Sequence, residues 1–462
     1  MLCCWSTMFE FNVPLLASFS PLTVLAIGVT VCVVLPVLRI AEELSRHPKH
    51  LEPKPGPFWK VVVGYALIQC SQLVRPRKSQ LKDRKWLDSR HFENTEDECS
   101  NDSFYWWANS KPGAKHRVCV TSRLGFHGVG GKKTTPWLVF DIDGRTFGLA
   151  EEFVRDSTPD ATNPETVVAL DESGNYLKYT CESPMKRWRL QYDGPVTELS
   201  AKGGEKAQRP FRATMDLNVE VIEPAFYYQQ DWDPLTIAKA MSTKPWSLQF
   251  FRGLRSEHQE HYEMGTTVTG TFEVKGEGRR GETIAAELSD APGMRDHSFG
   301  KRDWTIMVRY IWLGTISFDS PLEINGSLYT HMTGTAVHYG TSFKHMVAGG
   351  LMGKDAKRTI PFTGMTHMKD VAGKWYDNGG KVGIGHLIED DLQMTISIQG
   401  SPDCIVLDAQ RDSWKHGFLM QGDKFEVHEG TALYTVTHGK QSVRGHGLLE
   451  FGGVVRDNAK GT

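Results

Sequence analysis

The greatest concentration of reactive side chains lies in residues 292–304, which have the sequence PGMRDHSFGKRDW. Arg295, Asp296 and His297 are consecutive, and a second Arg–Asp pair follows them closely. Ionisable groups that fold against apolar strands form either a buried ion network or a site whose perturbed pKa values suit proton transfer. The residue types alone are compatible with both interpretations.

A second candidate is the pair His258 and His261, with Glu260 and Glu263 beside it. On a helix such a pair could hold a metal ion. We expect the segment to continue into a strand, where residues three apart face opposite sides. No third ligand with evident spacing follows, so we predict no metal site. We also predict no cofactor, because no nucleotide-binding fingerprint is present; the glycines of residues 125–134 miss the phosphate-loop spacing and indicate a hairpin instead.

Alternating apolar and polar residues predict strands through most of the chain. In residues 211–221, Phe211 and every second residue after it are apolar, which is typical of a strand with one face on a core. Glycine-rich turns separate several such runs, and closely spaced strands with short turns favour antiparallel barrels or sandwiches. Further strands are predicted at 118–124, 267–275, 306–313, 393–399 and 424–436.

The main helical signal lies at residues 233–250, where Pro234 suits a first turn and Pro245 interrupts the helix. We expect residues 231–250 to join two β domains, at 98–230 and 251–455. Each is near the size of one small barrel with a ligand cavity. The formal net charge of −2 gives no reason to expect a nucleic-acid partner.

Leu15–Leu38 is an uncharged, mainly apolar run, longer than the roughly 20 residues that cross a bilayer. We predict a single transmembrane helix there, preceded by a tail at 1–14 and followed by a juxtamembrane linker at 39–97. Basic residues follow the run and none precedes it, so the body is expected on the cytoplasmic side of the endoplasmic reticulum or another internal membrane. The N-glycosylation sequons at Asn101 and Asn325 indicate the opposite orientation, with the body on the lumenal side.

A shorter apolar stretch, Val61–Leu73, is too short to span a bilayer. Basic residues flank it on both sides. Two interpretations stay open for this stretch. It lies in the membrane interface as an amphipathic segment, or it packs on the body as a helix.

The segment GMRDHSFGKRDW at 293–304 resembles the G-x-R-D-H-S-W-G-x-R-x-W signature of AttH-like, two-barrel lipocalin-type proteins, with Phe299 where the signature has Trp. This group includes the carotenoid 1,2-hydratases, or hydroxyneurosporene synthases. The resemblance extends over roughly residues 98–452. It includes the segments at 98–106, 185–189, 260–263 and 444–450.

The resemblance implies an all-β fold of two consecutive antiparallel lipocalin-like β-barrels after the membrane helix. It also implies a reaction in which an acid protonates a carbon–carbon double bond of an isoprenoid or polyene-like substrate. Hydration, isomerisation and cyclisation, the reactions of a hydratase (lyase) or an isomerase, share this step. The expected catalytic residues are Asp296 as proton donor, His297 as its partner and Glu263 as an alternative acid. The expected substrate-binding residues are Arg295, Trp304, Tyr310, Trp312 and Tyr262.

Two other functions are compatible with the sequence. A barrel of this type could hold a lipid or pigment without changing it, because the fold alone does not determine function. A scaffold without a ligand is the third hypothesis. The sequence therefore leaves open whether the protein is an enzyme, and it does not indicate the oligomeric state.

Overall fold

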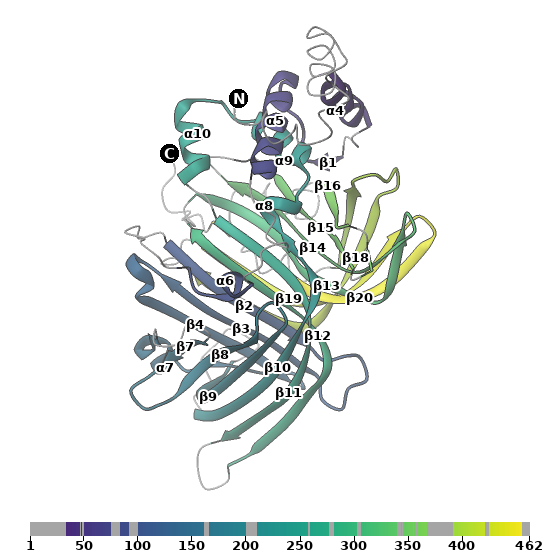
Figure 1. Cartoon of the computed structure of the whole chain (residues 1–462). Coiled ribbons are helices and arrows are strands. Elements are labelled where there is room, and N and C mark those ends of the chain that lie inside the picture. Colours follow the sequence, from purple (N-terminus) through teal and green to yellow (C-terminus); the bar gives the residue numbers. More distant parts are fainter. Residues whose placement is uncertain are drawn as a thin grey trace, which may run out of the picture.

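The protein folds into two β-barrels side by side, with most of its helices gathered at one end (Figure 1). The computed structural model describes residues 34–46, 48, 50–74, 84–91, 100–160, 166–199, 210–256, 259–276, 281–302, 306–339, 343, 345–353, 355–356, 358–366, 391–420 and 425–454. The all-β fold class and the two barrels predicted from the sequence are confirmed. Both sheets are antiparallel and closed.

The first barrel closes through pairing of β12 with β2 and of β9 with β10. A short extension, β6 (Thr158–Asp160), β7 (Thr166–Leu170) and β8 (Tyr176–Ser183), continues the sheet from β9. The barrel strands are β2 (Ser100–Asn109), β3 (Val118–His127), β4 (Lys133–Ile142), β5 (Arg145–Leu149), β9 (Arg187–Leu199), β10 (Pro210–Tyr227), β11 (Gln259–Gly276) and β12 (Thr283–Lys301).

The second barrel closes through pairing of β16 with β17, and the short strand β1 (Leu51–Glu52) adds to the free edge of β16. Its strands are β13 (Met307–Ile324), β14 (Ser327–Tyr339), β15 (Met346–Met352), β16 (Ile360–Thr366), β17 (Leu392–Ile398), β18 (Ile405–Met420), β19 (Phe425–His438) and β20 (Gln441–Val454).

The alternation in residues 211–221 is confirmed, because Phe211, Met215 and Val219 are buried in the core of the first barrel. Met394 and Ile396 of β17 are buried likewise in the second barrel. The glycine cluster at 125–134 forms the β3–β4 hairpin around a short 3₁₀ turn, Val129–Gly131, as predicted. Inward-facing apolar side chains fill the interiors of both barrels.

The division of the strands between the two units differs from the one predicted. β11 and β12 follow the helical segment at 231–250, but they pair with β10 and β2 and so belong to the first barrel. The helices are an insertion in the long β10–β11 connection, not a joint between barrels. Alternation shows that a segment is a strand, but it does not show which sheet the strand joins.

Helices pack on one end of the second barrel. α9 (Pro234–Ser242) begins at Asp233, whose carboxylate accepts a hydrogen bond from the Thr236 backbone nitrogen at 2.7 Å. The predicted break follows it, and the chain turns into α10 (Leu248–Ser256). The remaining helices are α4 (Leu35–Arg46), α5 (Phe58–Val74), α6 (Lys85–Asp88), α7 (Glu151–Asp156) and α8 (Tyr228–Asp231).

The stretch Val61–Leu73 lies within α5, which packs against α9 through Val61. Gly64 lets the two helices approach closely, because an added Cβ would lie 3.3 Å from the Ala238 Cβ. Packing on the body is therefore confirmed for one face of this helix. The predicted span at 15–38 lies outside the described residues except for its end, which belongs to α4. No helix in the described part of the chain is long and apolar enough to cross a membrane.

The pairing of β10 with β11 requires glycine at position 270. Gly270 has φ +153°, and an added Cβ would collide with the Asp216 carbonyl oxygen of β10. We expect Gly270→Ala to lower the free energy of unfolding by about 1–3 kcal/mol. Gly276→Ala is the control, because its Cβ would come no closer than 3.4 Å to Phe211. Urea unfolding of both variants is the measurement, and equal midpoints would contradict the register.

Candidate functional site

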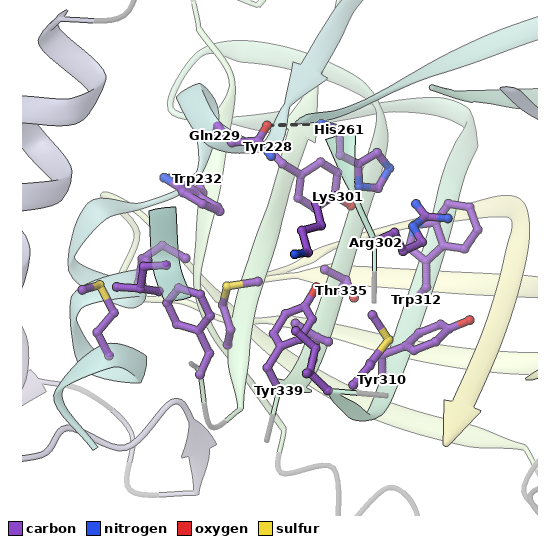
Figure 2. Close-up of a pocket in the computed structure, with 18 of the residues that line it drawn as sticks. Tyr228, Gln229, Trp232, His261, Lys301, Arg302, Tyr310, Trp312, Thr335 and Tyr339 are labelled. Carbon is purple, nitrogen blue, oxygen red and sulfur yellow. Dashed lines mark hydrogen bonds between the residues drawn. The ribbon is translucent and has the colours of Figure 1, made fainter. Parts of the chain in front are cut away.

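A cavity of about 380 Å³ lies between the two barrels, under the helices (Figure 2). β11 and β12 of the first barrel form one wall, and β13, β14, β15 and β20 of the second form the other. Helices α5, α8, α9 and α10 cover it. Most of the lining is apolar. It includes Trp232, Ile237, Met241, Met307, Trp312, Val337 and Phe343.

Two buried glutamates meet beside the cavity. Glu429 on β19 and Glu450 on β20 are direct partners across the ladder, so their side chains lie on the same face. Tyr310 donates a hydrogen bond to Glu450, and both residues line the cavity. Glu429 lies behind them, where it accepts hydrogen bonds from the Tyr105 hydroxyl at 2.9 Å and the Thr121 hydroxyl at 3.0 Å.

The two carboxyl groups titrate as a pair. Burial raises the pKa of Glu450 to about 7, although hydrogen bonds from Tyr310 and Glu429 oppose the shift. Burial and then the neighbouring charge of Glu450 raise the pKa of Glu429 well above its usual range. Two buried carboxyl groups that are hydrogen-bonded to each other cannot both be charged, so near neutral pH the pair holds at least one proton.

A histidine of the opposite wall carries a second proton. The His261 Nε2 lies 3.0 Å from the Asp296 Oδ1 and 3.2 Å from the Glu263 Oε1, and its ring stacks on Tyr228. Burial by itself would lower the pKa of His261, but the charges of Asp296 and Glu263 outweigh it and raise the pKa to about 9. His261 is therefore an imidazolium at neutral pH.

Two basic residues, Lys301 and Arg302, line the cavity together with His261. Figure 2 shows the Lys301 side chain extending towards the middle of the cavity, with Arg302 beside Trp312. The Arg302 guanidinium donates to the Ser298 hydroxyl at 2.6 Å. Burial and then the charge of Arg302 lower the pKa of nearby Arg123 to about 10. The site thus combines acidic and basic groups on an apolar background.

The other face of β12 carries a separate network. Alternation along the strand turns Arg295 and His297 away from the cavity that Asp296 lines. The Arg295 guanidinium contacts the Asp88 carboxylate at 2.5 Å, and its centre lies 4.8 Å from the Trp188 ring. His297 contacts the Asp102 carboxylate at 2.8 Å.

Tyr262 links these two ion pairs. Its hydroxyl lies 3.0 Å from the Arg295 Nη2 and 3.1 Å from the His297 Nδ1, and it donates to the Leu87 carbonyl at 2.8 Å. All these side chains are buried. This is the buried ion network that the residue types also allowed, and it holds α6 against the first barrel.

The structure thus divides the predicted site residues. Asp296, Tyr310 and Trp312 line the cavity, and Glu263 lies at its edge, where it accepts from Tyr228 at 2.6 Å and Trp312 at 2.8 Å. Arg295, His297 and Tyr262 belong to the network on the other face. Trp304 lies outside the described residues.

Sequence reasoning did not select His261, Glu429 or Glu450 for chemistry. His261 was considered only as a metal ligand, with His258, which lies outside the described residues. Within the described ranges, no group of three or more His, Cys, Asp or Glu side chains could hold a metal ion. Glu450 ends a segment included in the family resemblance, which was the one signal for it.

Residues 87–395 match the family described as "Domain of unknown function (DUF7064)". The chain belongs to this family. A search of curated proteins found no match. The DUF7064 match includes His261, Asp296 and Tyr310, but it ends before Glu429 and Glu450.

Solved structures similar to this DUF7064 protein include CghA and an AttH-type protein from Nitrosomonas europaea. CghA in complex with Sch210972 is 10% identical, with a TM-score of 0.41; 76% of this chain and 88% of that chain are covered. CghA in a second crystal structure is 9% identical, with a TM-score of 0.42 and coverages of 78% and 90%. The AttH-type protein is 10% identical, with a TM-score of 0.39 and coverages of 83% and 99%.

The two faces of β12 should respond differently to substitution. Arg295→Met leaves the Asp88 carboxylate buried without its cation and should cost about 3–5 kcal/mol of unfolding free energy. Asp296→Asn, one residue along, should cost clearly less, because Asp296 faces the cavity and His261 keeps Glu263 as a partner. Urea unfolding of the two variants measures the difference, and equal losses would show that the faces are wrongly assigned.

His261 should make stability depend on pH. Its pKa in the folded protein is about 9, above the ordinary value of 6.5. The stabilisation is complete below pH 6.5 and is lost as the pH rises through 9. The contribution of protonated His261 to the free energy of unfolding is about 3 kcal/mol at most. His261→Gln should flatten the fall in unfolding free energy between pH 7 and pH 9, measured by urea unfolding. A slope identical to that of the unsubstituted protein would contradict the assignment.

Proposed function

We propose that this protein is an enzyme that binds a hydrophobic small molecule between its barrels and transfers protons to and from it. The observation that carries the proposal is the pair Glu429 and Glu450, buried together beside an apolar cavity. A group with a pKa near 7 is well suited to general acid–base chemistry at neutral pH. Cavities of this size and composition are typical of small-molecule sites.

Glu450 is the proposed proton donor. Its O–H bond breaks as the proton moves to an electron-rich carbon of the ligand, and the carboxylate that remains is stabilised by Tyr310 and by the protonated Glu429. The ligand cation then loses a proton to Glu450, which gives isomerisation, or reacts with water or with a second double bond. The last two outcomes are hydration and cyclisation, and both return a proton to the site.

This assignment changes the role of Asp296. The sequence suggested Asp296 as the proton donor, whereas its position 3.0 Å from the His261 Nε2 favours a role as the partner of a protonated His261. We propose that Asp296 and Glu263 hold His261 as a fixed positive charge at one end of the cavity. Trp312 and Tyr310, which line the wall, present aromatic rings that can stabilise a ligand cation.

The isoprenoid or polyene class of substrate rests on the resemblance to the carotenoid 1,2-hydratases and on the apolar lining. The same lining suits a second function, in which the protein holds a lipid or pigment without changing it. The two functions differ in one property, because only the enzyme exchanges protons with its ligand.

We also propose that residues 15–38 anchor the chain in a membrane, with the body on the cytoplasmic side. The charge asymmetry of the sequence supports this orientation. Asn101 belongs to one of the two sequons that indicated a lumenal body. It is buried in β2, so it is not available for a glycan in the folded protein. Asn325 is exposed in the β13–β14 turn.

Proton exchange tests the proposed function and does not require the substrate to be identified first. We expect native mass spectrometry of the full-length protein, purified in mild detergent, to show a co-purifying hydrophobic molecule. After incubation in D₂O this molecule should gain deuterium on carbon. Glu450→Gln should retain the ligand and slow exchange by about 10²-fold or more.

Glu287→Gln, at an exposed position on β12 of the first barrel, is the control and should exchange normally. Ligand retention with equal, background-level exchange in all three proteins would support the binding protein and overturn the enzyme. A protein that carries no hydrophobic molecule would count against both functions.

A further inference from the structure

Helix α5 is apolar on its exposed side. The exposed side chains described in this helix are all uncharged and, apart from the thiol of Cys70, carbon and indole surface. Trp59 is 58% exposed, and Leu67 is 46% exposed. A surface helix of a soluble body normally turns a polar face to solvent. The exposed set is Phe58, Trp59, Val63, Ala66, Leu67 and Cys70.

Exposed apolar side chains also occur on α10 and α4, which lie at the same end of the molecule (Figure 1). Trp246, just before α10, contacts Trp59 with 5.5 Å between ring centroids and Phe251 with 5.3 Å. Leu248 at the start of α10 is 68% exposed, and Leu38 on α4 is 59% exposed. We call this surface, formed by the exposed apolar residues of α4, α5 and α10, the helical face.

A basic group lies among the aromatic rings of the helical face. The Lys60 Nζ lies 5.8 Å from the Trp59 ring and 5.7 Å from the Trp246 ring, and it donates to the Lys244 carbonyl at 2.8 Å. Tryptophan beside lysine is the combination that occurs where a protein meets the headgroup region of a bilayer.

The opposite side of α5 lines the cavity. Ile68 and Gln72 contribute to its wall, as does Leu254 from α10. Gln72 also donates to the carbonyls of Gln230 and Trp232, at 3.1 and 3.2 Å, which fixes the end of α5 to α8. The helical face and the cavity are thus separated by the thickness of a single helix layer.

We propose that the helical face lies on a lipid bilayer. The sequence itself indicates this occupant, because the uncharged run at 15–38, which we propose as the membrane anchor, ends within α4 and would bring the chain to the membrane beside this face. The cover of the cavity then lies at the membrane surface. In combination with the proposed function, on which this part rests, the ligand reaches the cavity from the bilayer.

A photo-crosslinking experiment distinguishes the possible occupants. The full-length protein is reconstituted into vesicles of phosphatidylcholine and phosphatidylserine, with p-benzoylphenylalanine in place of Val63. Leu433, on β19 of the second barrel, is the matched control, because Val63 is 43% exposed and Leu433 is 41% exposed. After illumination, mass spectrometry identifies the crosslinked partner.

We expect lipid adducts at position 63 at least about tenfold more abundant than at position 433, because only the helical face enters the interface. Adducts with residues 15–33 of the same chain, or with a second copy of the chain, would overturn the proposal and identify what covers the face instead. Equal lipid labelling at both positions would overturn it as well. Loss of deuterium exchange in the cavity leaves this result unchanged, so the two proposals fail separately.

Discussion

The relative position of the two barrels depends on buried carboxylates that each barrel places among donors of the other. Glu263 of the first barrel accepts hydrogen bonds from Trp312 and Thr333 of the second. Glu429 of the second barrel accepts from Tyr105 and Thr121 of the first. A buried carboxyl group that loses such partners is left unsatisfied, which costs about 1–3 kcal/mol. The two barrels are therefore held in one arrangement, and the cavity between them has a defined shape.

This constraint also sets the chemistry of the site. The contact between barrels removes water from Glu450 and Glu429, and that burial is the largest cause of their raised pKa values. On the first barrel, the pairing of β11 with β12 places Asp296 and Glu263 beside His261, and their charges outweigh its burial. One wall thus offers a neutral acid and the other a fixed cation. Neither barrel alone would produce this difference.

Local patterns in the sequence predicted the strands, because period-two alternation reports burial directly, and the family resemblance implied the two barrels. These patterns predicted less of the site. The cluster at Arg295, Asp296 and His297 was found from residue density, but adjacent residues of a strand face opposite sides, so only Asp296 reaches the cavity. The partnership of Glu429 with Glu450 depends on the β19–β20 register and on burial by the other barrel. Neither can be read from residue spacing within one segment.

The extent of the physical unit follows from barrel closure. The family match ends at residue 395, within β17, but β13 pairs with β20 and β17 with β18. Without β18, β19 and β20 the second barrel has two open edges, and unpaired edges of this length are strongly disfavoured. The same three strands carry Glu429 and Glu450. The part of the chain beyond the family match is therefore needed twice, to close the second barrel and to complete the acidic wall of the cavity.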